Sequence, residues 1–136
     1  MSIAIRYYSK FGHSKQMAEV VGKELGVQPQ TVDNPLTEPV DTLFLGAGVF
    51  LGKVNNAVVS FIQTLKPEQV RRVVLFGSCA IIKSPIPQMQ SLLEAQGITV
   101  DAKSFTCKGS MGPLHGGHPD KQDLENLRQF VAGVKQ

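Results

Sequence analysis

Apolar runs that are typical of strands alternate with runs that are typical of helices along the whole chain, and this alternation limits the possible folds most strongly. Two of the strand-like runs, Leu43–Leu45 and Val73–Phe76, are continuously apolar, as expected for strands that are buried on both faces. Strands that alternate with helices usually pair in parallel, because the helices cross over the faces of the sheet. We therefore expect an α/β domain with a parallel sheet covered by helices on both sides.

The apolar runs also give the expected strand positions. The main strands are expected at Ile3–Tyr8, Thr42–Gly46, Arg72–Gly77 and Ile98–Phe105, with a weaker one at Val27–Val32. Pro29 cannot donate a hydrogen bond to a strand ladder, which suits a position at the edge of the sheet. No helix is expected in residues 33–41, because this short segment is interrupted by Pro35 and Pro39.

Apolar side chains recur at helical spacing in the segments between and after these strands. The expected helices are Lys15–Leu25, Asn55–Leu65, a third that Ser84 and Pro85 open, and a last one that Pro119 opens. We expect Ser14 and Asn55 to cap the first two helices and Gly26 to stop the first. Asp120 and Asp123 near the start of the last helix would favour its dipole.

Length and composition fit a single domain that spans residues 1–136. No apolar run approaches the roughly 20 residues that span a bilayer, and no signal peptide is apparent, so we expect a cytoplasmic protein that does not contact membranes. The net charge of +3 comes from lysines and arginines that do not cluster, which disfavours a nucleic-acid surface. In a reducing compartment, Cys79 and Cys107 are expected to be free thiols.

The segment Tyr8–Ser14 joins the first expected strand to the first expected helix and contains a glycine and two serines. A helix N-terminus offers unpaired N–H donors and a partial positive charge, and small residues let an anion approach them. The helix carries Lys15 but no carboxylate before Glu19, which is consistent with an anion supplied from outside the chain. An ordinary strand–helix turn capped by Ser14 is the alternative interpretation.

The segment Gly46–Lys53 has some features of a nucleotide-binding loop. A Walker loop requires a glycine at the position of Ala47 and a serine or threonine at the position of Val54, so the motif fails twice. The dinucleotide fingerprint requires a glycine at the position of Leu51 and normally occupies the first strand–helix turn. Neither kind of nucleotide site is therefore indicated here.

Several parts of the chain resemble the flavodoxin family. Tyr8–Ser14 is similar to the loop that holds the FMN phosphate in flavodoxins, and Val40–Ala47 is similar to the third strand of the family, which leads into a flavin-contacting loop. Phe105–Gly109, Gly117–Pro119 and the pair Asp123-Leu124 are similar to the last strand and helix of small members. The resemblance covers essentially the whole chain. It implies a flavodoxin-like three-layer α/β fold with five parallel strands in the order 2-1-3-4-5.

The resemblance also implies an FMN site at the carboxyl ends of the strands. The phosphate would be surrounded by Ser9, Lys10, Phe11, Gly12, His13 and Ser14, and the isoalloxazine ring would be flanked by Ala47, Gly48, Val49, Phe50, Gly52, Ser78, Cys79 and Ala80. Phe11 occupies the position of the family's second hydroxyl side chain. The chain has no Trp, so Phe50 is the best-placed candidate for stacking on the ring; a core residue or a lid is its alternative role.

No side chain is expected to be catalytic, because FMN itself would carry the electrons. The resemblance implies an electron-transfer protein that acts between redox partner proteins, as a monomer or a weak homodimer. The alternatives are a small NAD(P)H-dependent flavin or quinone reductase, and a binding module of the same fold without flavin. Cys107, His115 and His118 have irregular spacing, so no metal site is expected.

Overall fold

The computed structural model describes residues 2–10, 12–48, 53–79, 84–108 and 120–134. In this part of the chain, strands and helices alternate as the apolar pattern predicts. The elements in chain order are β1 (Ile3–Tyr7), α1 (His13–Leu25), β2 (Gln30–Thr31), β3 (Val40–Gly48), α2 (Asn56–Thr64), β4 (Val70–Cys79), α3 (Ile86–Ala95), β5 (Val100–Lys108) and α4 (Lys121–Val134).

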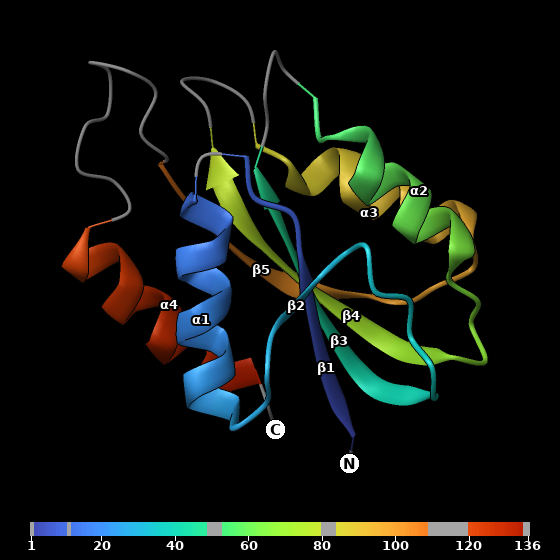
Figure 1. Cartoon of the computed structure of the whole chain (residues 1–136), viewed down its shortest axis with the longest axis horizontal. Helices are drawn as coiled ribbons and strands as arrows, with labels where there is room; N and C mark the ends of the chain where they lie inside the picture. Colours follow the sequence, from blue (N-terminus) through green and yellow to red (C-terminus); the bar gives the residue numbers. More distant parts are fainter. Residues whose placement is uncertain (1, 11, 49–52, 80–83, 109–119, 135–136) are drawn as a thin grey trace.

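The strands form one five-stranded sheet in the order β2-β1-β3-β4-β5, and every neighbouring pair is parallel. The predicted fold class and strand order are therefore confirmed. Figure 1 shows α1 and α4 against one face of the sheet and α2 and α3 against the other. No described helix is long and apolar enough to cross a membrane.

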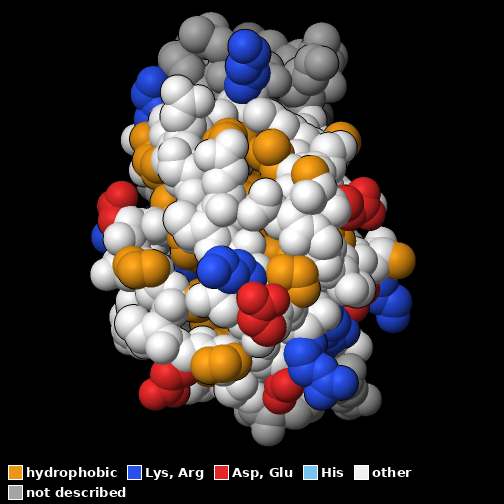
Figure 2. Space-filling model, turned by 90° about the vertical axis from the view of Figure 1, so that its right-hand side faces the viewer, with side chains coloured by type: hydrophobic (Ala, Val, Ile, Leu, Met, Phe, Trp, Pro, Cys, Tyr) orange, Lys and Arg blue, Asp and Glu red, His pale blue; other side chains and the backbone are white. Residues whose placement is uncertain are grey.

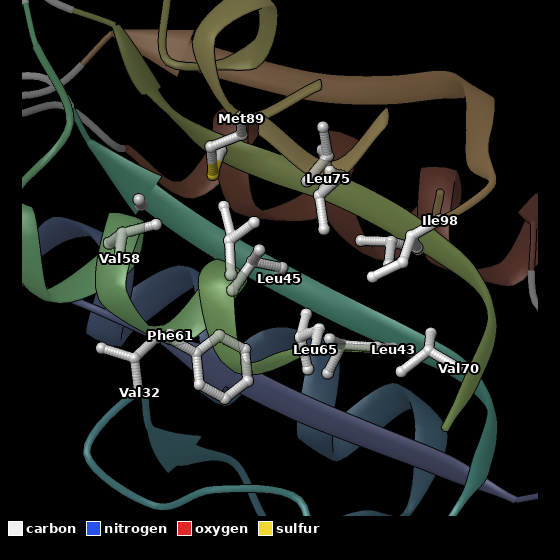
Figure 3. Close-up of a cluster of buried hydrophobic side chains, with 14 of the residues drawn as sticks. Val32, Leu43, Leu45, Val58, Phe61, Leu65, Val70, Leu75, Met89 and Ile98 are labelled. Atoms are coloured by element: carbon white, nitrogen blue, oxygen red, sulfur yellow. The ribbon is translucent and has the colours of Figure 1, made fainter. Parts of the chain in front are cut away.

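Buried side chains fill both interfaces between the sheet and its helices. Leu43 and Leu45 of β3 pack beneath α2 and α3 together with Phe61 and Met89 (Figure 3). Phe44 lies between these two leucines and faces α1 and α4 instead, because successive side chains of a strand alternate between its faces. Complete burial of each such side chain contributes roughly 1.5–3 kcal/mol. This explains why the continuously apolar runs form the central strands.

The connection from β2 to β3 contains no helix in residues 32–39, as the prolines predict. The edge strand β2 is shorter than predicted, with two residues. Arg6 of β1 is only 7% exposed and lies beneath this connection. Its Nε donates to the carbonyl oxygen of Asn34 at 2.8 Å, and its Nη1 donates to that of Ile5 at 3.0 Å. The guanidinium thus pairs with backbone carbonyls and ties the connection to β1.

The helix starts agree with the predictions in two of three cases. Asn55 caps α2, since its Oδ1 accepts from the N–H of Ala57 at 2.8 Å. Ser84 Oγ accepts from the N–H of Ile86 at 3.1 Å, and Pro85 stands at the start of α3. The cap predicted at Ser14 is wrong: α1 begins at His13, one residue before it. Gly12 takes the N-cap position instead, with φ of 90°.

The residues that lead into α4 lie partly outside the described part of the chain. The helix begins at Lys121, and Pro119, which was predicted to open it, lies outside the described residues. Asp120 and Asp123 each accept the backbone N–H of the other, at 2.8 and 2.9 Å. These two carboxylates therefore stabilise the first turn, as their predicted position near the helix start implies.

Candidate functional site

The carboxyl ends of β1, β3 and β4 meet at one edge of the sheet, at the top of Figure 1. The chain crosses to opposite sides of the sheet after β1 and after β3, because α1 covers one face and α2 the other. Ligands of open parallel sheets bind in the crevice outside such a switch point. The N–H of Tyr8 donates to the carbonyl oxygen of Gly46 at 3.1 Å, which continues the pairing of these two chain segments beyond β1. We take this carboxyl edge as the candidate site.

The start of α1 is suited to an anion. No described side chain caps the helix, and its first turn contains no acidic residue. Its first intrahelical bond at this end runs from the N–H of Gln16 to the carbonyl oxygen of Gly12, at 3.0 Å. The N–H groups before Gln16 have no carbonyl within the helix to bond, and they carry the positive end of the dipole. A phosphate placed here would satisfy donors that the helix itself cannot.

Ser9 supplies an independent indication of a ligand. Its Oγ is the one buried side-chain nitrogen or oxygen in the described part of the chain without a hydrogen-bond partner. Burying an unpaired hydroxyl is unfavourable by about 1–3 kcal/mol, so such groups are rarely left unpaired without a reason. A phosphate oxygen at the turn after β1 would accept this hydroxyl hydrogen. The residues present therefore fit a phosphorylated ligand.

Three elements bring further small polar groups together beside this turn. Ser14 of α1 is 2% exposed and Ser78 of β4 is 7% exposed. Gly48, at the end of β3, lies between them: a Cβ at this position would stand 2.6 Å from Ser78 Oγ and 3.9 Å from Ser14 Oγ. The absence of a side chain at Gly48 is what allows this approach. The structure thus brings together three predicted site residues that are distant in sequence.

The remaining predicted residues take various positions. Lys10 is exposed in the turn before α1, and His13 is half-buried at the start of this helix. Ala47 is completely buried in the core beneath α2 and α3. Cys79 is half-buried at the end of β4. The other predicted site residues, Phe11, Val49, Phe50, Gly52 and Ala80, lie outside the described residues, as do His115 and His118. The prediction that these loops flank a flavin ring stays a prediction.

The two cysteines are free thiols, as predicted. Cys107 of β5 pairs in register with Ser78 and packs towards α1, where its Sγ lies 3.8 Å from Met17 Sδ. Cys79 follows Ser78 in β4, so its side chain points to the other face of the sheet. The pKa of the Cys107 thiol is raised to about 12, mainly by burial and further by the negative charge of Asp123. A protonated thiol on the opposite face from its neighbour is unsuited to disulfide chemistry.

Sequence reasoning did not include Lys53 among the site residues. Lys53 is exposed just beyond the segment that follows β3, and the next residue, Val54, is buried. The N–H of Val54 donates to Gln88 Oε1 of α3 at 2.9 Å, which fixes the backbone here. A lysine in the connection between a predicted strand and the next predicted helix is the signal that would have found this residue, because the carboxyl ends of parallel strands share one edge.

The sequence profile of the flavodoxin domain matches residues 4–109 of this chain. No curated protein matches the chain. Among solved structures, a flavodoxin from the domain Archaea has a TM-score of 0.78 at 16% identity, covering 98% of this chain and 96% of its own. A short-chain flavodoxin associated with a PDU bacterial microcompartment has a TM-score of 0.74 at 16% identity, covering 98% of this chain and 97% of its own.

A larger protein contains the same fold as one part. Rubredoxin oxygen:oxidoreductase from Desulfovibrio gigas has a TM-score of 0.75 at 16% identity, and the match covers 96% of this chain but 34% of that one. At these identities the structural likeness shows the fold. The profile match, which spans most of the chain, is the evidence on family.

Proposed function

The chain belongs to the flavodoxin family, and on this premise we propose that it binds FMN and carries electrons between proteins. When bound, FMN would supply the redox chemistry. The chain would supply the grip on the phosphate, the packing around the ring and the surrounding charges. The observation that carries the proposal is the buried, unpartnered Ser9 Oγ beside the uncapped start of α1.

The phosphate would be held by donors that the structure already orients. The first N–H groups of α1 lack intrahelical partners, and the Ser9 hydroxyl lacks a partner within the described chain. Ser14, buried at the second position of the same helix, adds a hydroxyl on the side of Gly48. A charge-assisted hydrogen bond to a phosphate contributes roughly 1.5–3 kcal/mol. A few of these hydrogen bonds would bind the phosphate of FMN specifically.

Absorbance of the purified protein, with and without added FMN, tests the proposal. Flavin bands that bleach with dithionite or a partner reductase, but not with NADPH alone, would support the carrier. Bands that bleach with NADPH alone would favour a flavin or quinone reductase of the same fold. The absence of bands and of FMN binding would refute both and leave a binding module without flavin.

A charge at the start of α1 tests the phosphate position more sharply. Gly12→Asp places a carboxylate at the helix start, and we expect FMN affinity to fall at least tenfold through repulsion. Gly26→Asp is the matched control, because Gly26 also has a positive φ, of 69°, and its Cβ would also meet nothing within 4 Å. Gly26 lies at the other end of the same helix. Equal affinities for the two variants would refute the phosphate site.

A further inference from the structure

The carboxyl edge of the sheet carries exposed lysines around the proposed site. Lys10 follows β1, Lys15 lies in the first turn of α1, and Lys53 follows β3; all three are exposed. We propose that these residues, called the basic rim below, dock an acidic surface of a partner protein that exchanges electrons with the bound FMN. This inference rests on the proposed function and adds the chemistry of the partner.

Between the ends of β1 and β4, the described charges at this edge are lysines, and an exposed carboxylate, Asp33, follows the edge strand β2 beside β1. The nearest carboxylate along α1 is Glu19, one turn further from the edge than Lys15. The carboxylates of Asp120 and Asp123 lie at the start of α4, which packs beside β5, and they bond each other's backbone N–H groups. These acids therefore cap a helix at the margin of the edge.

At the opposite end of the sheet, some opposite charges form pairs. Arg72 bonds Asp101 at 2.6 Å and Arg71 lies 3.7 Å from Asp41, both at the amino end of the sheet. Figure 2 shows the same contrast on the face of α2 and α3: red and blue side chains intermix over its lower half, whereas its upper end shows blue without red. The whole chain has a net charge of +3, and three of its exposed lysines lie at the carboxyl edge.

The placement of the lysines fits a protein surface better than a small anion. Lys10 and Lys53 extend from separate elements, each next to backbone that is tied to the fold, through Tyr8 N–H and Val54 N–H respectively. Their exposed side chains spread along an edge of the sheet. Flexible lysines of this kind act as point charges that attract and orient a large oppositely charged partner.

Two probe proteins of opposite charge test the proposal. An acidic plant-type blue-copper protein and the basic mitochondrial cytochrome c are mixed with the reduced, FMN-loaded protein between 10 and 200 mM NaCl. Each acceptor takes one electron, Cu(II) becoming Cu(I) or Fe(III) becoming Fe(II), and two acceptors reoxidise one flavin with release of its protons to water. We expect salt to slow the reaction with the acidic acceptor and to speed that with the basic one. The opposite salt dependence would overturn the proposal.

The double variant Lys15→Gln/Lys53→Gln removes two charges of the rim and leaves Lys10, which belongs to the predicted phosphate loop. For a patch of about three carboxylates roughly 10 Å away at low salt, each lysine changes the rate by about three- to fivefold. We therefore expect the acidic acceptor to react roughly tenfold more slowly. The control Lys23→Gln/Lys66→Gln removes two exposed lysines at the other end of the molecule and should change little. Equal effects of the two double variants would refute the basic rim.

Two further experiments distinguish failure of the docking proposal from failure of the proposed FMN binding. If ferricyanide responds to the rim variant and the acidic protein does not, the rim recognises a small anion and the docking proposal is wrong. An NMR titration of the flavin-free, ¹⁵N-labelled protein with the reduced copper protein needs no cofactor. Salt-sensitive shifts around Lys15 and Lys53 support docking even if FMN binding fails. Their absence, with FMN bound normally in the absorbance test, refutes docking alone.

Discussion

Replacing Ser9 by alanine should have opposite effects on the stability of the flavin-free protein and on its affinity for FMN. The hydroxyl is buried and has no partner in the described chain, so in the flavin-free protein it has lost water without gaining a hydrogen bond. Removing an unpaired buried hydroxyl should recover part of a desolvation cost of about 1–3 kcal/mol. We expect Ser9→Ala to raise the free energy of unfolding by about 1 kcal/mol.

The same substitution should weaken FMN binding. The variant loses a hydrogen bond to a charged phosphate oxygen, which is worth about 1.5–3 kcal/mol. This corresponds to a loss of roughly 10- to 150-fold in affinity. Quenching of FMN fluorescence measures the dissociation constant, and urea unfolding monitored by circular dichroism measures stability, each with and without FMN. Stabilisation by saturating FMN should consequently be smaller in the variant.

Ser91→Ala is the control, because Ser91 is exposed on α3, away from the carboxyl edge. It should leave FMN affinity unchanged and alter stability by less than about 0.5 kcal/mol. A Ser9→Ala protein that is less stable without FMN would show that the hydroxyl has a partner inside the protein. Unchanged FMN affinity would show that it does not face the phosphate. Either result refutes the reasoning from the unpaired hydroxyl.

Three further predictions concern charges and thiols. Arg72→Ala should destabilise the fold by about 2–3 kcal/mol in urea unfolding, because it removes hydrogen bonds to Asp101 and to the last turn of α4. The control Arg71→Ala should lower the free energy of unfolding by less than about 0.5 kcal/mol, because the Arg71 side chain is 83% exposed. Equal losses of stability in the two variants would contradict this account. Hydrogen bonds from Arg128 and Gln129 lower the pKa of Glu125 to about 2. Because the folded pKa lies below the ordinary 4.5, this stabilisation is present above about pH 4.5 and lost as the pH falls towards 2; a carboxyl NMR titration should show the low midpoint, and Arg128→Gln should raise it. In a variant without Cys79, iodoacetamide at pH 8 should alkylate Cys107 at least tenfold more slowly than it alkylates free cysteine, since the pKa of the Cys107 thiol is raised to about 12. Mass spectrometry measures the rate. Alkylation of Cys107 as fast as that of free cysteine would contradict the burial of this thiol.

The central strands and the layer arrangement could be predicted because they depend on burial alone. Leu43–Leu45 and Val73–Phe76 have no polar side chain, and the structure buries them on both faces. The strands extend further than predicted, however. Val40 of β3 and Val70 of β4 pair with each other, each two residues before the predicted start of its strand, and the N–H of Val40 donates to the carbonyl oxygen of Gln69 at 2.8 Å. Pairing of this kind depends on a residue thirty positions away and leaves no local signal.

Two further features were missed. Ser14 has a good capping side chain, but α1 begins one residue earlier because Gly12 adopts a left-handed conformation that other residues rarely take. Arg6 sits in an apolar strand pattern, and only the tertiary structure supplies the carbonyl oxygens of Asn34 and Pro35 that accept its bonds. The location of the candidate site at the carboxyl edge follows from the strand order, which was predicted. The polar approach of Ser14, Gly48 and Ser78 required the folded sheet.

The glycines that imitate a nucleotide loop at the end of β3 are explained by packing. A Cβ on Gly46 would stand 2.2 Å from Cε2 of the buried Phe76 ring, and one on Gly48 would stand 2.6 Å from Ser78 Oγ. The neighbouring strand therefore occupies the space that side chains here would need. Large side chains fill the sheet up to Phe76, and beyond it β3 and β4 continue to the carboxyl edge with small residues. The small residues at the switch point thus follow from the same packing that ends the core.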